Sequence, residues 1–279
     1  MSTLTQPAQP SLAKDSFVAT GSGLSFIGLL RSESIKLWSL RSTVWSFSLV
    51  ILLALGMAAL MATTIGLEGA PALDQAMQDS IVLQASTVGL AFGQLIVAVL
   101  GVLVISGEYS TGMIKSTLAA IPRRLPMLWA KAAVLFVCTF VVGSIATLAS
   151  FLLAAPILAG KGVHANLFSS DILLPMLANV FFLAVVAIFA LAIGTIVRRS
   201  AGGIAAVLGI LLILPIVLSV LGAMQIQWAV DVVPFMLDSA GADLAGAQTK
   251  EVWENLLIMA GWLVPSVALA AILLKRRDA

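Results

Sequence analysis

The residues best suited to do chemistry lie in the segment 107–117. Gly107 and Gly112 have the spacing of a phosphate-binding loop, in which backbone amides hold nucleotide phosphates and a lysine follows the second glycine. Met113 stands at the lysine position, and the first lysine, Lys115, comes two residues later. The sequence therefore contains no ATPase motif of its own, and we predict neither an enzymatic activity nor a cofactor bound by this chain.

Two further residue types could carry chemistry, and each occurs once. His164 lies in a segment between apolar stretches, where an exposed loop histidine is a better interpretation than a metal ligand. Cys138 is the single cysteine, so the sequence can form neither an intramolecular disulfide nor a cysteine-based metal site. There is also no H-E-x-x-H or G-x-S-x-G motif, which argues against a protease or hydrolase.

The composition identifies the environment in which these residues must work. The chain has 279 residues, of which 61% are hydrophobic and 10% are charged. Soluble domains carry roughly 25% charged residues, so this chain has too few charges to cover a surface in water. The net charge is only +2, which provides no footprint for nucleic acid. We predict an integral membrane protein with the lipid bilayer as its surroundings.

Six charge-free apolar stretches are long enough to cross the hydrocarbon core as helices, which takes about 20 residues. They predict an all-α, polytopic membrane protein in which residues 24–279 form a single six-helix transmembrane domain. Residues 1–23 are rich in polar residues and proline and predict a disordered N-terminal arm. The six predicted spans are 43–64, 82–106, 132–154, 173–197, 203–224 and 256–274.

The positions of the basic residues predict the orientation, because Lys and Arg near span ends stay on the cytoplasmic side. Thirteen of the 15 basic residues fall in alternate segments, which predicts that both termini are cytoplasmic. Only Lys161 and Lys250 fall on the other side. The thirteen are Lys14, Arg31, Lys36, Arg41, Lys115, Arg123, Arg124, Lys131, Arg198, Arg199, Lys275, Arg276 and Arg277.

Three segments outside the spans predict additional helices. Residues 24–41 mix apolar and charged side chains without one clean stripe, and we predict an interfacial helix on the cytoplasmic surface. The outer segment 225–255 is too apolar to hang in water, so we expect short helices that fold back and cap the bundle. After the second span, a short helix from Ser110 or Thr111 to Ile121 would present apolar residues as a docking surface for a partner protein.

Inside the spans the polar residues are neutral. Gln94 and Asn179 are the most informative of them, because an amide in a span needs a partner on another helix, in water or on a substrate. No ionisable residue lies in any of the six stretches, so we expect no fixed charge at membrane depth and a preference for apolar or amphipathic solutes. Gly89, Gly93 and Gly101 predict close helix packing.

Two segments resemble a known family. The run 107–124, Gly-Glu-Tyr-Ser-Thr-Gly-Met-Ile-Lys-Ser-Thr-Leu-Ala-Ala-Ile-Pro-Arg-Arg, resembles the loop after the second span of bacterial type-2 ABC exporter permeases. The run 31–45 is similar to the entry of that family into its first span. The resemblance implies a permease in the bacterial plasma (inner) membrane that pairs with a second permease subunit, as a homodimer or heterodimer. Two separate ATPase subunits would bind ATP and Mg on the cytoplasmic side.

The resemblance also implies roles for individual residues. The N-terminal interfacial helix and the coupling helix after the second span would contact the ATPase subunits, the outer segment 225–255 would form a gate, and the substrate path would follow the dimer axis. Residues implied in coupling are Glu33, Lys36, Glu108, Tyr109, Met113, Ile114 and Lys115. Residues implied in the translocation path are Phe92, Gln94 and Pro215.

Two other interpretations remain open from the sequence. A channel or secondary carrier would transport without ATP or a partner, although the predicted absence of intramembrane charge argues against an ion-coupled version. A non-transporting membrane scaffold would bind a partner without substrate-dependent turnover.

Overall fold

The computed structural model describes residues 25–66, 73–113, 124–246 and 249–276, and these residues form helices with no strand among them. The side chains of residue 124 and of residues 249–251 are not described. The elements are α1 (Phe26–Ser39), α2 (Arg41–Thr64), α3 (Gln75–Ser110), α5 (Arg124–Ala159), α6 (Ser170–Val197), α7 (Ser200–Leu208), a π-helix (Gly209–Ile213), α8 (Leu214–Ala223), α9 (Gln227–Val232), a 3-10 turn (Val233–Phe235), α10 (Leu237–Gly246) and α11 (Thr249–Arg276).

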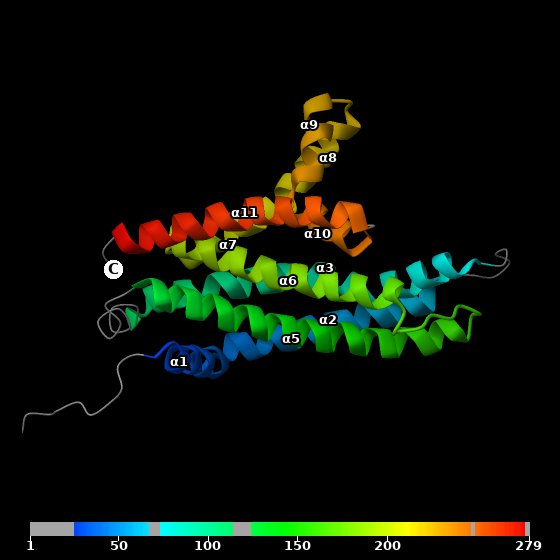
Figure 1. Cartoon of the computed structure of the whole chain (residues 1–279), viewed down its shortest axis with the longest axis horizontal. Coiled ribbons are helices and arrows are strands. Elements are labelled where there is room, and N and C mark those ends of the chain that lie inside the picture. Colours follow the sequence, from blue (N-terminus) through cyan, green and yellow to red (C-terminus); the bar gives the residue numbers. More distant parts are fainter. Residues whose placement is uncertain (1–24, 67–72, 114–123, 247–248, 277–279) are drawn as a thin grey trace, which may run out of the picture.

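Among the residues that the structure describes, six segments are long and apolar enough to cross a membrane, which confirms the predicted fold class of a multi-pass helical membrane protein. The predicted stretches form the centres of these segments, and the helices extend beyond them into charged residues. The stretch 82–106, for example, is the centre of the 36-residue helix α3. Helices α2, α3, α5, α6 and α11 run side by side along the long axis of the molecule (Figure 1).

The core of the bundle lies around α6, whose buried residues point in every direction around the helix. Close contacts require glycine at two positions of α3. A Cβ atom on Gly89 would lie 2.4 Å from Ala54 Cα of α2, and one on Gly101 would lie 2.6 Å from the Ala187 carbonyl oxygen of α6. The predicted close packing of helices is thus confirmed at these two sites.

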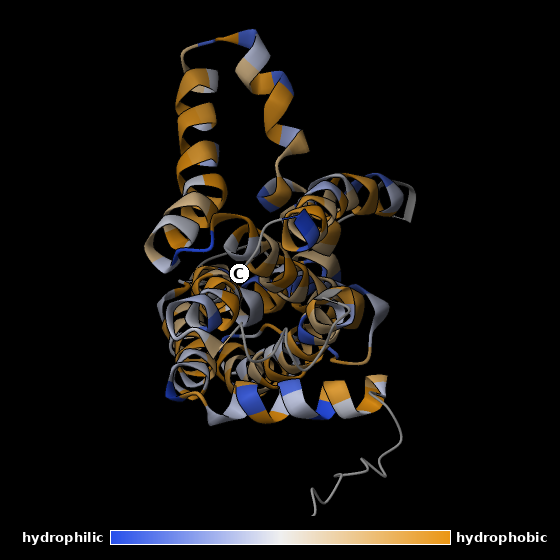
Figure 2. Cartoon of the chain, turned by 90° about the vertical axis from the view of Figure 1, so that its left-hand side faces the viewer, coloured by the Kyte–Doolittle hydropathy of each residue, from blue (hydrophilic) through white to orange (hydrophobic). Residues whose placement is uncertain are grey.

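The fifth span, predicted as 203–224, corresponds to the helical segment Ser200–Ala223, which bends in its middle. Helix α7 lies along the bundle, whereas α8 turns away from it and, with α9, forms a pair that projects sideways (Figures 1 and 2). The bend coincides with the π-helix Gly209–Ile213 and with Pro215, which has no amide proton for the helical ladder. The sequence signal was the proline, but apolar periodicity cannot predict a π-helix.

The outer segment 225–255 does contain the short helices that we predicted, but they differ in position. Helix α10 packs against α6 and α11 and buries Leu237, Ala240 and Leu244. Helix α9 instead packs against α8, where Leu218, Ala229 and Met236 form a small separate cluster. Only α10 therefore covers the bundle.

The N-terminal helix α1 runs crosswise to the spans at one end of the bundle (Figure 2). It begins at Ser25, whose side-chain oxygen accepts a hydrogen bond from the amide of Gly28. The start of α5 and the C-terminal end of α11 lie at the same end (Figure 1). We call this end the basic end, because Lys36, Lys131 and Arg276 are among the residues there.

The prediction for the segment after the second span needs a correction. Ser110 does not begin a new helix but ends α3, because the hydroxyls of Ser110 and Thr111 both donate to the carbonyl of Gly107 and continue the helical turn. Gly112 then takes a φ of +72°, which breaks the helix. Residues 1–23, the rest of the predicted coupling helix, Ile114 and Lys115 lie outside the described residues.

Candidate functional site

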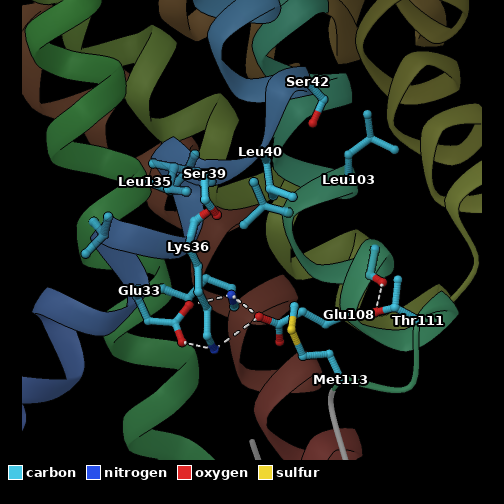
Figure 3. Close-up of a pocket in the computed structure, with 15 residues that line it drawn as sticks. Glu33, Lys36, Ser39, Leu40, Ser42, Leu103, Glu108, Thr111, Met113 and Leu135 are labelled. Atoms are coloured by element: carbon cyan, nitrogen blue, oxygen red, sulfur yellow. Dashed lines mark hydrogen bonds and ion pairs between the residues drawn. The ribbon is translucent and has the colours of Figure 1, made fainter.

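Four charged side chains from three helices meet at the basic end. Lys131 Nζ, from α5, donates hydrogen bonds to Glu33 Oε2 of α1 at 2.5 Å and to Glu108 Oε1 of α3 at 2.9 Å. Lys36 Nζ, from α1, donates to Glu33 Oε1 at 2.8 Å and lies 3.4 Å from Glu108 Oε1. Figure 3 shows Glu33, Lys36 and Glu108 pointing toward one another. We call Glu33, Lys36, Glu108 and Lys131 the charge cluster.

Three of the four members are buried. The exposed fractions of Glu33, Glu108 and Lys131 are 3%, 4% and 3%, whereas the side chain of Lys36 is 29% exposed. Removing an ion from water costs several kcal/mol, which is offset only when the partner charges are close and well oriented. The two carboxylates and two ammonium groups balance in charge, and their geometry fixes α1 relative to α3 and α5.

The electrostatics of the two α1 members follow from this arrangement. Burial raises the pKa of Glu33, but the attraction of Lys131 and the hydrogen bonds from both lysines outweigh it, so the pKa lies below its ordinary value. Burial lowers the pKa of Lys36, but the hydrogen bond to Glu33 and the charge of Glu108 raise it above its ordinary value. Both groups are therefore charged at neutral pH.

The sequence of α1 explains how these charges come to be buried. Leu29, Glu33 and Leu37 are spaced four residues apart and form the buried stripe of the helix. The sequence shows no clean stripe because a glutamate lies in the middle of the buried face and large apolar residues such as Ile27 and Ile35 lie on the exposed face. Leu29 and Leu37 join the main hydrophobic core, so α1 is held by apolar contacts on both sides of the ion pairs.

A cavity of about 360 Å³ lies beside the charge cluster, between α1, α3 and α5. Its other lining residues include Leu40, Leu103 and Leu135, and Met113 borders it where α3 ends (Figure 3). Met113 is 42% exposed. Glu108 Oε2 is buried and has no hydrogen-bond partner among the described residues, so the cluster leaves one acceptor unused at this end of α3.

A second contact joins the end of α3 to the turn between α6 and α7. The guanidinium carbon of Arg198 lies 5.2 Å from the centre of the Tyr109 ring, within the range of a cation–π interaction. Arg198 has a φ of 60° and ends α6, so the contact holds the turn that leads into the fifth span. The basic end thus links α1, α3, α5 and the α6–α7 turn.

The structure brings together most of the residues that the resemblance implied in coupling. Glu33, Lys36 and Glu108 belong to the charge cluster, Met113 lines the adjacent cavity, and Tyr109 contacts Arg198. Lys131 was not predicted as a site residue, because in the sequence it is one of the loop cations that indicate the orientation of the chain. The available signal was its position directly before the charge-free stretch 132–154.

The residues implied in a translocation path are not brought together. Gln94 lines a polar cavity between α3, α6 and α10, Phe92 is 48% exposed, and Pro215 lies in α8, away from that cavity. Gln94 Nε2 donates to Asp238 Oδ1 of α10 at 2.8 Å. Gln94 is near the midpoint of α3, so α10 brings a carboxylate beside this helix although the charge-free stretches themselves contain none.

Metal ligation is not supported by the part of the chain that the structure describes, in which no three His, Cys, Asp or Glu side chains form a metal-binding group. His164 is exposed at the end opposite α1. Its backbone amide donates a hydrogen bond to Gln78 Oε1. Comparison with known proteins adds no relative: no protein-family model matches the chain, and no curated protein matches it.

Proposed function

We propose that this chain is the membrane-spanning permease subunit of an ATP-driven ABC exporter of the bacterial plasma membrane. Two permease subunits form the translocation path, and separate ATPase subunits bind ATP and Mg and dock at the basic end. The observation that carries the proposal is the charge cluster, which joins the crosswise helix α1 to the ends of two spans in one buried unit.

A transport protein driven by a separate ATPase needs a docking surface that moves as one body with its spans. Apolar contacts alone could hold α1 against the bundle, but they would allow it to slide. The ion pairs of Glu33 with Lys131 and of Glu108 with Lys131 are directional, and buried ion pairs can fix one relative position at a cost in stability. A push on α1 would thus pass directly to α3 and α5.

The distribution of charge supports the side on which this surface lies. Basic residues near span ends are retained in the cytoplasm, so the basic end is the cytoplasmic end in this proposal. ATP is available there, and the chain itself has Met113 in place of the lysine that a nucleotide-binding loop requires. The hydrolysis of ATP then belongs to the partner subunit.

The proposed mechanism is a shift between two arrangements of the bundle. ATP binding favours the closed pair of ATPase subunits, and the rigid unit of α1, α3 and α5 converts that closure into a rearrangement of the spans. The contact between Arg198 and Tyr109 extends the same unit to the α6–α7 turn, and from there to the bent fifth span. In this proposal, the bend at the π-helix is where the fifth span changes its shape between the two arrangements.

Purification of the tagged chain from its native membrane in mild detergent, followed by an ATPase assay of the eluate, tests this proposal. We expect ATPase activity in the eluate of the unaltered chain, because the ATPase subunits co-purify with it. The eluate of Met113→Asp should lack this activity, because the variant places a new charge on the docking surface. Phe168→Asp is the matched control, since Phe168 is 82% exposed at the opposite end. Eluates that are all without ATPase activity, or equal activity with both variants, would contradict the proposal.

One observation favours a second function, a self-contained ion-coupled carrier. Asp238 and Gln94 place an ionisable group beside the middle of a span, which is a common feature of carriers that bind a coupling ion. Vesicles containing only the purified chain distinguish the two functions. Solute uptake driven by an ion gradient without ATP would support the carrier, whereas the exporter requires its ATPase subunits.

A further inference from the structure

The cavity between α3, α6 and α10 is lined by polar groups on all three helices. On α3, Gln84, Thr87 and Gln94 share one face of the helix. Asn179 of α6 and Asp238 of α10 face them across a cavity of about 410 Å³. Pockets for small organic ligands have volumes of roughly 300–1,000 Å³, so this one is large enough for a small solute.

The polar groups of this cavity include several hydrogen-bond acceptors, one of which is a carboxylate. One amide N–H of Gln94 donates to Asp238 Oδ1, and one amide N–H of Asn179 donates to the Pro175 carbonyl at 3.0 Å. The hydroxyl of Thr87 donates to the Leu83 carbonyl. A ligand can use the rest of the Asp238 carboxylate and the amide oxygens of Gln94 and Asn179 as acceptors, while the amides of Gln84, Gln94 and Asn179 keep further N–H donors.

The charge of the cavity has one sign. Asp238 is its one ionisable group, and none of the described residues that line it is basic. A half-buried carboxylate beside the middle of a span has lost much of its water, and its hydrogen bond from Gln94 is neutral and does not cancel the charge.

The remaining wall of the cavity is apolar and aromatic. Leu90 and Leu183 line it together with Phe182, whose ring is held against Gly241 of α10. An added Cβ on Gly241 would lie 2.4 Å from that ring, so the position of the ring depends on this glycine. The π face of an aromatic ring near a carboxylate can contact an organic cation, and the ring also packs against apolar groups.

We propose that this cavity binds a small organic ammonium ion, with the ammonium group on Asp238 and its hydrocarbon part against Phe182. The acceptors match the N–H donors of a protonated primary amine, and the apolar wall matches its hydrocarbon part. The binding site is a property of the chain in either of the two functions above, so it does not rest on the proposed exporter function.

Binding of benzylammonium to the purified full chain in lipid nanodiscs, measured by equilibrium dialysis, tests this inference. Benzyl alcohol is the neutral probe of the same shape. We expect saturable binding of benzylammonium, at least tenfold weaker binding of benzyl alcohol, and at least tenfold weaker binding of benzylammonium to Asp238→Asn. Asparagine keeps the oxygen that accepts from Gln94 Nε2, so the variant removes the charge but not this hydrogen bond.

Asp243→Asn is the matched control, because Asp243 lies on the same helix but lines a different cavity. It should bind benzylammonium as the unaltered chain does. A second measurement needs no variant: benzylammonium should slow the carbodiimide modification of Asp238 but not that of Asp243. Equal affinity for the amine and the alcohol, equal affinity of Asp238→Asn and the unaltered chain, or unprotected Asp238 would overturn the inference.

Discussion

Replacing Lys131 by methionine tests whether the charge cluster holds α1 in place. Methionine keeps much of the length and apolar stem of lysine but removes the charge that joins Glu33 to Glu108. Two buried carboxylates then share only Lys36, whose side chain is 29% exposed. We therefore expect α1 to leave the bundle more often.

The magnitude follows from the burial of the remaining charges. Removing one partner of a buried ion pair costs about 3–5 kcal/mol, and we take the lower end, about 3 kcal/mol, because Lys36 still neutralises part of the charge. A cost of about 1.4 kcal/mol changes an equilibrium tenfold, so the opening of α1 should become roughly a hundredfold more frequent. Amide hydrogen exchange of α1 measures this opening directly.

The matched control is Lys161→Met. Lys161 is exposed at the end opposite α1, where Nζ donates to the carbonyl oxygens of Thr63 and Ile65, so its loss should leave exchange in α1 unchanged. Adding Glu33→Gln to Lys131→Met should recover part of the protection, because one of the two carboxylates that share Lys36 is removed. Unchanged exchange of α1 in a folded Lys131→Met protein would refute the reasoning.

Two further predictions concern pH and packing. The pKa of Glu33 is below its ordinary value of 4.5 and the pKa of Lys36 is above its ordinary value of 10.5, so the stability that these two groups contribute is complete between pH 4.5 and 10.5. Hydrogen exchange of α1, corrected for its intrinsic pH dependence, should accelerate as the pH falls through the lowered pKa of Glu33 or rises through the raised pKa of Lys36. A pH-independent corrected rate would contradict this. Gly101→Ala should lower the thermal unfolding temperature, at a cost of about 1–3 kcal/mol, because the added Cβ would lie 2.6 Å from the Ala187 carbonyl oxygen. Gly56→Ala is the control and should not lower it, because nothing lies within 4 Å of the added Cβ. Equal unfolding temperatures of the two variants would contradict the packing prediction.

The number and position of the spans could be predicted from the sequence because they depend on local composition. A stretch such as 173–197 must form its backbone hydrogen bonds internally in lipid, and only a helix of this length does so. The small residues of α3 were equally informative, since Gly89 and Gly101 allow helices to approach whatever their partners are. The partners themselves, α2 and α6, required the structure.

The two polar sites were harder to predict because their members are far apart in the chain. Lys131 reaches Glu33 across 98 positions and Asp238 reaches Gln94 across 144 positions, and no local pattern pairs them. Both sites were hidden from the sequence because Lys131 counts there as one of the orienting loop cations and Asp238 falls in the outer segment 225–255. Helix α10 folds back on α6 and α11, and that long-range packing brings the carboxylate to the middle of α3.

Site-specific photo-crosslinking from position 113 in the native membrane tests the central claim of a permease driven by a separate ATPase. A photoreactive phenylalanine analogue at Met113 lies beside the charge cluster, and the same analogue at Phe168 reports on the opposite end of the bundle. We predict that position 113 crosslinks to a protein with a nucleotide-binding loop, identified by mass spectrometry, and that position 168 does not. Crosslinks to no ATPase from position 113, or to the same ATPase from both positions, would contradict the account.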